Sequence, residues 1–397
     1  MSQSLPQTGF ATTFSPEVVD LIAQKNCENL SGSVEIPFGL AGPVLVKHFV
    51  SLEHTSSSDA MSSSDPLSFP RKRESSVSEE FSLPLATSEG ALVASVSRGC
   101  KAIRLSGGAG VFVKKIGLSR APVFKCVSGA SAQEFANWLD QNIKEFSAVA
   151  EATSHHLKYL SHLTWIRGRF VFVRFVFDTG EAMGMNMVSI ALQKAWEVMS
   201  IKLPSELAST KLISLSSNVC CDKKDSQINR LMGRGYWAQA EVILTKEVIN
   251  TVLKTTPQEL WQAHYAKNLI GTNVAGSLSQ KMQVSNVIAA MYLATGQDMA
   301  HVTEGSQANT TVEIDGENIY FAVTLPNLNL GTVGGGTWLP KQTQARKLIR
   351  SGKDINAAQL TAAVAVGCLA GEISGLAALA SNTLAAAHER LGRIKGE

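Results

Sequence analysis

The 397-residue sequence predicts an α+β protein in which a small domain is inserted into a larger one. Three observations lead to this prediction. The chain is long enough for two or three domains, and its 45% of hydrophobic residues can fill large cores. Strand-like and helix-like hydrophobic patterns both occur, in an irregular order. Residues 122–215 have their own succession of strands and helices, and different patterns flank them.

The N-terminal part predicts a short helix followed by strand and turns. Ser15 and Pro16 are suited to begin a helix, and a Gly- and Pro-rich strand segment covers 28–46. In 51–80, 11 of 30 residues are serine, so we expect an inserted loop that is dispensable for folding. The predicted order is an N-terminal helical segment (1–27), the large domain (28–121), the small domain (122–215) and the rest of the large domain (216–397).

Regular structure resumes after the serine-rich segment. Apolar residues recur at helical spacing after Glu89, which places this carboxylate near a helix N-terminus. A Gly-rich turn at 107–110 and a strand at 111–113 follow. The small domain then begins with a strand and one long helix over 131–152. It continues with an alternating strand over 168–177, a helix and a final strand.

The last part of the chain predicts helices around 246–256 and over 286–295, and a hairpin over 310–325. The apolar stretch 360–387 has the length of a membrane span. Because it is rich in Ala and Gly and is interrupted by Glu372, we interpret it as a buried helix that continues to His388.

Composition excludes several classes of protein. A net charge of +3 without a long basic stripe argues against a nucleic-acid platform. The six cysteines form no CxxC pair, which excludes zinc ribbons and thioredoxin-type motifs, and we expect reduced thiols in the cytoplasm. Charged residues make up 17%, a low fraction that is typical of surfaces buried between subunits.

Several candidate functional residues each have an ordinary alternative. The Gly-rich loops 180–187 and 332–337 suit phosphate binding, or are tight turns. Lys223 is a candidate cation for an oxyanion, or part of a solvated turn. Glu89 and Asp298 are candidate acids or helix caps, and His388 is a candidate acid–base group or a packing residue. From the residues alone, these alternatives stay open.

Taken together, the motifs resemble those of 3-hydroxy-3-methylglutaryl-CoA (HMG-CoA) reductases over nearly the whole chain. The matching segments are ENLSGSVEIPFGLAGPV, PLATSEGALVASVSRGCKAI, SRAPV, AMGMNM, the DKK of SSNVCCDKK, ATGQD, TVGGGT and GEISGLAALASNTLAAAH. The short segment after His388 resembles class I members, in their soluble archaeal and bacterial form. The resemblance implies a large α/β substrate-binding domain with an inserted ferredoxin-like cofactor-binding domain.

The resemblance also implies roles for individual residues. The catalytic residues would be Glu89, Lys223, Asp298 and His388. The substrate-binding residues would be Arg120, Ser216, Asp222, Lys224, Lys267 and Asn286 for the HMG group, and Ser95 and Arg98 for coenzyme A. The cofactor-binding residues would be Glu181, Met183, Gly184, Met185, Asn186, Gly334, Gly335 and His155. No metal is implied.

The implied reaction is reduction of HMG-CoA to mevalonate and coenzyme A by two hydride transfers from NADPH. NADH is an alternative cofactor, since Glu181 and His155 stand where many members carry Asp and Arg. The implied assembly is a homo-oligomer, a dimer or tetramer, with the active site at a dimer interface. The segment KMQVSN (281–286) is shorter than its family counterpart. Two other functions remain open, NAD-linked breakdown of mevalonate and a non-catalytic homologue that binds CoA ligands.

Overall fold

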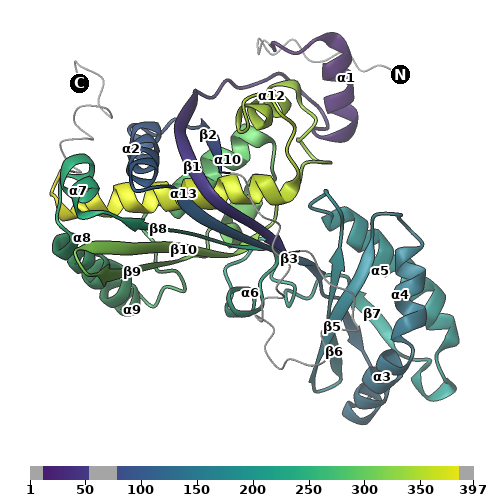
Figure 1. The fold of residues 1–397 in the computed structure, drawn as a ribbon. Coiled ribbons are helices and arrows are strands. Elements are labelled where there is room, and N and C mark those ends of the chain that lie inside the picture. Colours follow the sequence, from purple (N-terminus) through teal and green to yellow (C-terminus); the bar gives the residue numbers. More distant parts are fainter. Residues whose placement is uncertain (1–11, 53–77, 384–397) are drawn as a thin grey trace.

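The computed structural model describes residues 12–52 and 78–383, which form two bodies of unequal size joined through strand β3 (Figure 1). β3 (Ala109–Arg120) pairs with β1 and β8 in the large body and with β6 in the small one. Each body has its own cluster of buried hydrophobic side chains. The predicted mixture of helices and strands is confirmed.

The large body is built on a mostly antiparallel sheet. β1 (Phe38–Leu52) runs antiparallel to β2 (Glu79–Ala86) and parallel to β3, while β3, β8, β10 and β9 are antiparallel neighbours. The remaining strands are β8 (Gly235–Leu244), β9 (Asn309–Asp315) and β10 (Asn318–Leu328). β9 and β10 form the predicted hairpin, and its turn follows Asp315.

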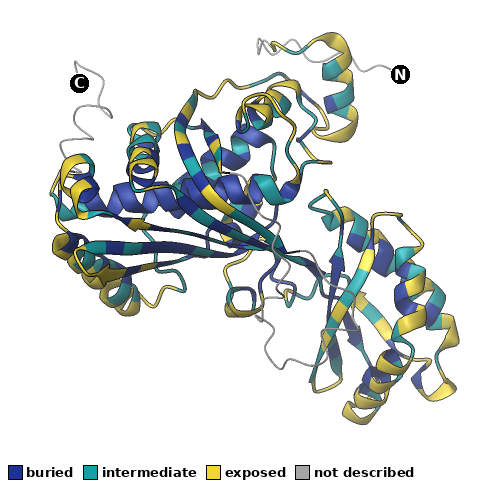
Figure 2. Cartoon of the chain, in the orientation of Figure 1, coloured by how far each residue is buried: buried dark blue, intermediate teal, exposed yellow. Residues whose placement is uncertain are grey.

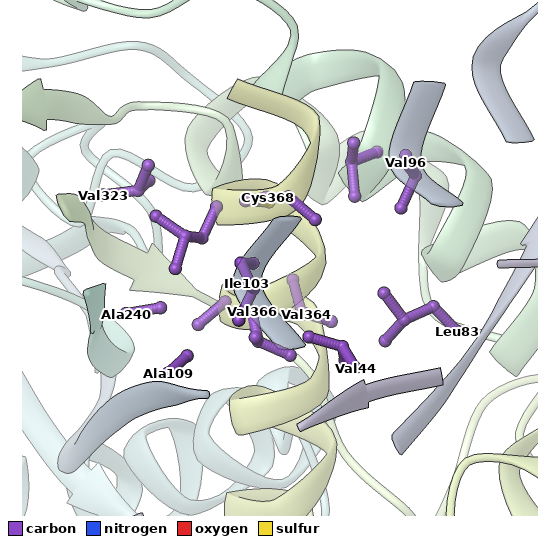
Figure 3. Close-up of a cluster of buried hydrophobic side chains, with 14 of the residues drawn as sticks. Val44, Leu83, Val96, Ile103, Ala109, Ala240, Val323, Val364, Val366 and Cys368 are labelled. Carbon is purple, nitrogen blue, oxygen red and sulfur yellow. The ribbon is translucent and has the colours of Figure 1, made fainter. Parts of the chain in front are cut away.

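The long helix α13 (Ala357–Ala380) runs through the centre of the large body (Figure 2). Every residue from Leu360 to Ala378 is buried, against strands on one side and α2 (Leu92–Leu105) and α10 (Val284–Thr295) on the other. Figure 3 shows Val364, Val366 and Cys368 of this helix among side chains of the surrounding strands and α2. The prediction of a buried helix is confirmed.

The C-terminal limit of α13 differs from the prediction. The helix ends at Ala380, and Asn382 takes a left-handed conformation with φ +55°. The backbone N–H of Thr383 then donates to the carbonyl of Ala378 at 3.0 Å, which closes the last turn. The prediction that this helix continues to His388 was therefore wrong, and His388 itself lies outside the described residues.

The small body has one strand more than expected. Its order is β4 (Val123–Lys125), α3 (Gly129–Gln141), α4 (Ile143–Glu151), β5 (Lys158–Arg167), β6 (Phe170–Asp178), α5 (Met185–Met199) and β7 (Lys211–Ser214). The strands lie in the order β7-β4-β6-β5, all antiparallel. β5 went unpredicted because it is an edge strand whose residues are mostly half-buried, which blurs the alternation.

Three other predicted boundaries need correction. The long helix over 131–152 is two helices, because Asn142 leaves helical geometry and its side chain bonds to the carbonyl of Trp138. The strand predicted at 111–113 is the middle of β3. β1 and β2 reach into both ends of the serine-rich segment, of which 53–77 lie outside the described residues.

The remaining helices are short and surround these cores. Part of the predicted helix 246–256 is π-helical (Ile249–Leu253). The bounds are α1 (Pro16–Lys25), α6 (Gln227–Met232), α7 (Lys246–Val248), α8 (Pro257–Ala263), α9 (Thr272–Ala275), α11 (Val302–Gly305) and α12 (Pro340–Leu348).

Candidate active site

The turn that carries Lys223 has an unusual backbone. Three residues of this turn have positive φ values, +66° at Asn218, +52° at Cys221 and +58° at Lys223. These angles lie in the left-handed region, which residues other than glycine rarely adopt. Each such residue costs about 1–2 kcal/mol, so the surrounding structure must hold the turn. The backbone N–H of Lys223 donates to Glu304 at 3.1 Å, and Asn229 donates to the carbonyl of Cys221 at 3.3 Å.

The ammonium of Lys223 lies 2.8 Å from a carboxylate oxygen of Asp298. Both side chains are more than a third exposed, so a ligand has access to the pair. Asp298 also caps the short helical turn Met299–His301 by accepting from the backbone N–H of Ala300. Burial opposes the effect, but the hydrogen bonds from Lys223 and Ala300 lower the pKa of Asp298. The structure thus brings together two of the predicted catalytic residues.

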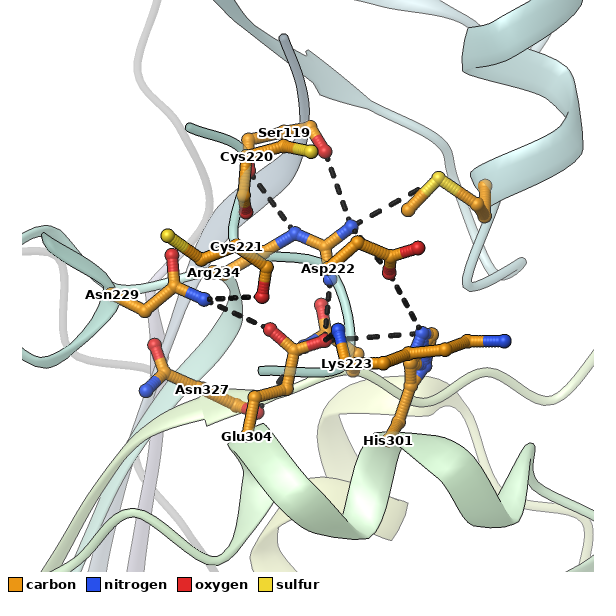
Figure 4. Close-up of polar contacts among 12 residues, drawn as sticks. Ser119, Cys220, Cys221, Asp222, Lys223, Asn229, Arg234, His301, Glu304 and Asn327 are labelled. Carbon is orange, nitrogen blue, oxygen red and sulfur yellow. Dashed lines mark hydrogen bonds and ion pairs between the residues drawn. The ribbon is translucent and has the colours of Figure 1, made fainter. Parts of the chain in front are cut away.

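Behind this pair lies a buried charge network that sequence analysis missed (Figure 4). Arg234 and Glu304 are fully buried and form an ion pair at 2.6 Å. Arg234 also contacts Asp222 at 3.2 Å, and His301 lies 3.3 Å from the same Asp222 oxygen. Asp222, His301 and Glu304 are close enough to hold a metal ion, but the guanidinium of Arg234 already bonds to both carboxylates.

Burial governs the pKa values in this network. It lowers the pKa of His301 to about 4, and the positive charge of Arg234 adds to the effect. Burial raises the pKa of Glu304 to about 7, against the lowering effect of Arg234. A sequence signal existed, since His301 follows Asp298, and Glu304 follows His301, at the three-residue spacing of neighbours on a helix.

The two predicted anion loops lie side by side. Ala182 forms a parallel bridge with Val333, and the N–H of Thr332 donates to the carbonyl of Glu181 at 2.9 Å. The contact is tight enough that a β-carbon on Gly331 would come within 2.6 Å of the Met183 nitrogen. The loops therefore form one surface, which begins at the N-terminus of α5 where anions are favoured.

This loop surface adjoins the Lys223 turn. Arg120 donates to the sulfur of Met185 at 3.2 Å and lies 3.5 Å from Asp222. On the other side, Gln297 precedes Asp298 and exchanges two hydrogen bonds with the backbone of Gly331. Arg120, Asp222, Lys223, Asp298 and the paired loops are therefore one contiguous group, which we call the lysine cluster.

A second group surrounds Glu89. Its exposed carboxylate accepts a hydrogen bond of 2.7 Å from Asn286 in the first turn of α10. Nearby, Ser95 and Arg98 of α2 both bond to Ser374 of α13. We call these residues the glutamate cluster.

The N-terminus of α10 in this second group is held by a buried carboxylate. Glu372 accepts hydrogen bonds of 2.6–3.1 Å from the consecutive backbone N–H groups of Met282, Gln283 and Val284. It also accepts one of 2.7 Å from the hydroxyl of Thr310. Burial raises the pKa of Glu372, and these bonds oppose the rise.

The two clusters lie at opposite ends of α10. Asn286 is near the start of this 12-residue helix, and Asp298 follows its end. The helix is about 18 Å long. Within one chain, Glu89 and the Lys223–Asp298 pair therefore lie at opposite ends of this helix, although the sequence grouped all of them.

The other predicted residues have individual surroundings. Ser216 contacts the sulfur of Cys220, Lys224 donates to the carbonyl of Asp222, and Lys267 donates to the carbonyl of Lys281. Glu181 accepts from Thr332 and from the first N–H of α13, so its carboxylate is already engaged. The remaining cofactor candidates are at the paired loops (Gly184, Asn186, Gly334, Gly335) or exposed after α4 (His155).

Comparisons with known proteins give matches over nearly the whole chain. A family model described as hydroxymethylglutaryl-coenzyme A reductase matches residues 5–393. A 3-hydroxy-3-methylglutaryl-coenzyme A reductase of Halobacterium salinarum is 42% identical over 379 residues, which cover 94% of this chain and 86% of the relative. One of Methanocaldococcus jannaschii is 39% identical over 375 residues, with the same coverage of 94% and 86%.

A solved structure of similar fold is a class II 3-hydroxy-3-methylglutaryl-CoA reductase from Streptococcus pneumoniae, bound to NADPH in open conformations. Its TM-score is 0.66 at 19% identity, and the match covers 91% of this chain and 79% of that one. At this identity the likeness shows the fold alone. The family match and the archaeal relatives extend over nearly the whole sequence, and the chain belongs to the hydroxymethylglutaryl-coenzyme A reductase family.

Proposed function

We propose that this protein reduces HMG-CoA to mevalonate and coenzyme A, using two hydrides from two molecules of NADPH. One observation carries the proposal: an accessible lysine ammonium is paired with a carboxylate beside a double anion-binding loop. A thioester carbonyl that accepts a hydride becomes an oxyanion, and a fixed cation stabilises that charge. The names of the archaeal relatives give the substrate.

The four catalytic residues divide the proton and charge work. Lys223 stabilises the hemithioacetal oxyanion after the first hydride arrives at the carbonyl carbon. When the carbon–sulfur bond breaks, mevaldehyde forms and coenzyme A leaves as a thiolate, which His388 protonates. A second hydride converts the aldehyde to an alkoxide beside Lys223. Glu89 supplies the proton for that alkoxide, and Asp298 orients the lysine ammonium by pairing with it.

NADPH supplies the hydride, and the paired loops suit its phosphates. The paired loops form one surface at the N-terminus of α5, which favours anions, and a β-carbon at Gly334 or Gly335 would meet no other atom of the described residues within 4 Å, so a phosphate can approach closely. The strand order β7-β4-β6-β5 with helices between supports a ferredoxin-like cofactor-binding domain over 122–215. His155 would face the 2′-phosphate of NADPH. Glu181 would act indirectly, because it holds the second loop through Thr332.

For the substrate, we assign the HMG group to the lysine cluster together with Ser216, Lys224, Lys267 and Asn286. Arg98 and Ser95, on α2, would contact coenzyme A. We further propose that the protein acts in the cytoplasm. The domain limits proposed are 1–27, 28–121, 122–215 and 216–397.

The complete site would form between two copies of the chain. The lysine cluster and the glutamate cluster lie at opposite ends of α10, a helix about 18 Å long, so one substrate carbonyl would not meet both within one chain. In the proposed dimer, Glu89 of the second copy lies beside Lys223 of the first copy, and the two residues together complete one active site. Val34, Phe38 and Leu40 are large apolar side chains between 47% and 76% exposed, which suits a subunit contact.

The direct test is oxidation of NADPH, followed at the pyridine absorbance after adding HMG-CoA to the purified protein. We expect two NADPH consumed per HMG-CoA, with mevalonate and free coenzyme A as products. Binding of HMG-CoA without oxidation would favour a non-catalytic homologue. NAD reduction on adding mevalonate and coenzyme A, without the forward reaction, would favour mevalonate breakdown.

The shared site has its own test by mixing inactive variants. Unfolded and refolded together, Lys223→Ala and Glu89→Gln chains should regain about a quarter of wild-type activity, since half the dimers are mixed and each has one intact site. A mixture of Lys223→Ala with Asp298→Asn is the matched control. Both changes lie in the lysine cluster, so no mixed dimer has an intact site. Equal activity in the two mixtures would contradict the arrangement.

A further inference from the structure

Glu304 holds the backbone of Lys223 from a position that no substrate reaches. Its side chain is fully buried, and one carboxylate oxygen accepts both the N–H of Lys223 at 3.1 Å and the guanidinium of Arg234 at 2.6 Å. The other oxygen accepts from Asn229 at 2.9 Å. Figure 4 shows the Lys223 side chain extending away from this network. Glu304 therefore contacts the backbone of Lys223, while the lysine ammonium pairs with Asp298.

The two residues before Lys223 are anchored by the same network. Asn229 bonds to both Glu304 and the carbonyl of Cys221. The side chain of Asp222 is held by Arg234. Because Cys221 and Lys223 both adopt left-handed backbone angles, the turn depends on these contacts to keep its shape. The direction of the lysine side chain follows from that backbone.

We propose that Glu304 is a positioning residue for the reaction, which fixes the Lys223 ammonium at the developing oxyanion through the hydrogen bond to the lysine's backbone N–H. The inference rests on the proposed reductase function and adds a residue with no contact to substrate or cofactor. Arg234 supports Glu304 in this role, because its positive charge neutralises the buried Glu304 carboxylate. Glu304 acts by accepting this hydrogen bond, and it does not transfer a proton during the reaction.

Two substitutions separate a hydrogen-bonding role from a charge role. Glu304→Ala removes the acceptor for Lys223. Glu304→Gln keeps an oxygen where Lys223 and Arg234 need it, and its new amide faces Asn229. The Asn229 carbonyl oxygen has no hydrogen-bond partner among the described residues, so an amide flip lets it accept from the glutamine, at the cost of the Asn229 bond to the Cys221 carbonyl. Leu253→Ala is the control, a cavity in the large core at a fully buried residue.

The experiment measures kcat and KM with HMG-CoA and with mevaldehyde, and amide hydrogen exchange in a peptide spanning 219–225. For Glu304→Ala we expect kcat to fall about 10²-fold on both substrates, with KM within about threefold, because an oxyanion contact is lost. Exchange at Lys223 should be faster. Glu304→Gln should stay within about tenfold of wild type, and Leu253→Ala should keep wild-type kcat while losing stability.

Two results would overturn the proposal. One is a Glu304→Ala protein that loses stability but keeps its kcat and its slow exchange at Lys223, which would make Glu304 purely structural. The other is a Glu304→Gln protein as impaired as the alanine variant, which would point to the charge. If the wild type fails to oxidise NADPH with HMG-CoA, the reductase function fails, and the exchange measurement still decides whether Glu304 anchors Lys223.

Discussion

Replacing Glu372 by alanine is expected to loosen the N-terminus of α10 and destabilise the large body. Its carboxylate is the acceptor for three consecutive backbone N–H groups and for the hydroxyl of Thr310. Each buried donor left without a partner costs about 1–3 kcal/mol, so four of them give a loss of about 4 kcal/mol or more. Glu372→Gln should stay within about 1 kcal/mol of wild type, because its oxygen can serve the N–H groups and Thr310 can reverse its hydroxyl.

The assay is urea unfolding followed by circular dichroism, with amide exchange in the peptide 280–288 as the local measurement. Exchange there should accelerate in the alanine variant and stay slow in the glutamine variant. A loss below about 1 kcal/mol for alanine, or equal losses for both variants, would refute the reasoning.

The pH dependence of stability gives a second test on the same variants, because the pKa of Glu372 fixes the direction of the change. Burial raises the folded-state pKa of Glu372 above its ordinary value of 4.5. The folded protein therefore holds this proton more tightly than the unfolded chain. The contribution of Glu372 is fully present below pH 4.5 and is lost as pH rises through the raised pKa. The stability of Glu372→Gln relative to wild type should thus increase with pH above 4.5.

Three further predictions concern the reaction. Lys223→Ala should abolish both hydride steps, and more than about a tenth of wild-type kcat would contradict its oxyanion role. The preference for NADPH over NADH should be modest, because a histidine, His155, stands where many members carry an arginine for the 2′-phosphate; a strong NADPH preference, or NADH preferred throughout, in the ratio of kcat/KM values would exclude this. His388→Gln should slow HMG-CoA reduction about 10²-fold and leave mevaldehyde reduction within a few-fold. Equal losses on both substrates would assign His388 another role.

Local patterns predicted the features that depend on local chemistry. The α10 helix, the β9–β10 hairpin and the buried central helix all follow from hydrophobic spacing and turn residues. The resemblance implied that Lys223 and Asp298 belong to one catalytic site, and the structure shows the two side chains in contact. The network behind it was missed, because Arg234 and Glu304 become partners only when segments 70 residues apart are packed together.

The same limit applies to the two anion loops. Each was predicted from its own glycines, but nothing in either sequence indicates that they form a single surface. Glu372 was treated as an interruption of an apolar helix. Its carboxylate instead caps another helix, a role visible only once α13 lies beside α10.

Strand β3 makes the two bodies mechanically continuous. The backbone of β3 pairs with β8 in the large body and with β6 in the small body. Any rotation of the small body relative to the large one must therefore twist this strand. The chain leaves the small body at Ser217, whose N–H donates to Ala121 just beyond β3, and reaches Lys223 six residues later. A swing of the small body would therefore pull on the segment 217–223, and the anchored Lys223 turn is the first part of the large body to meet that strain.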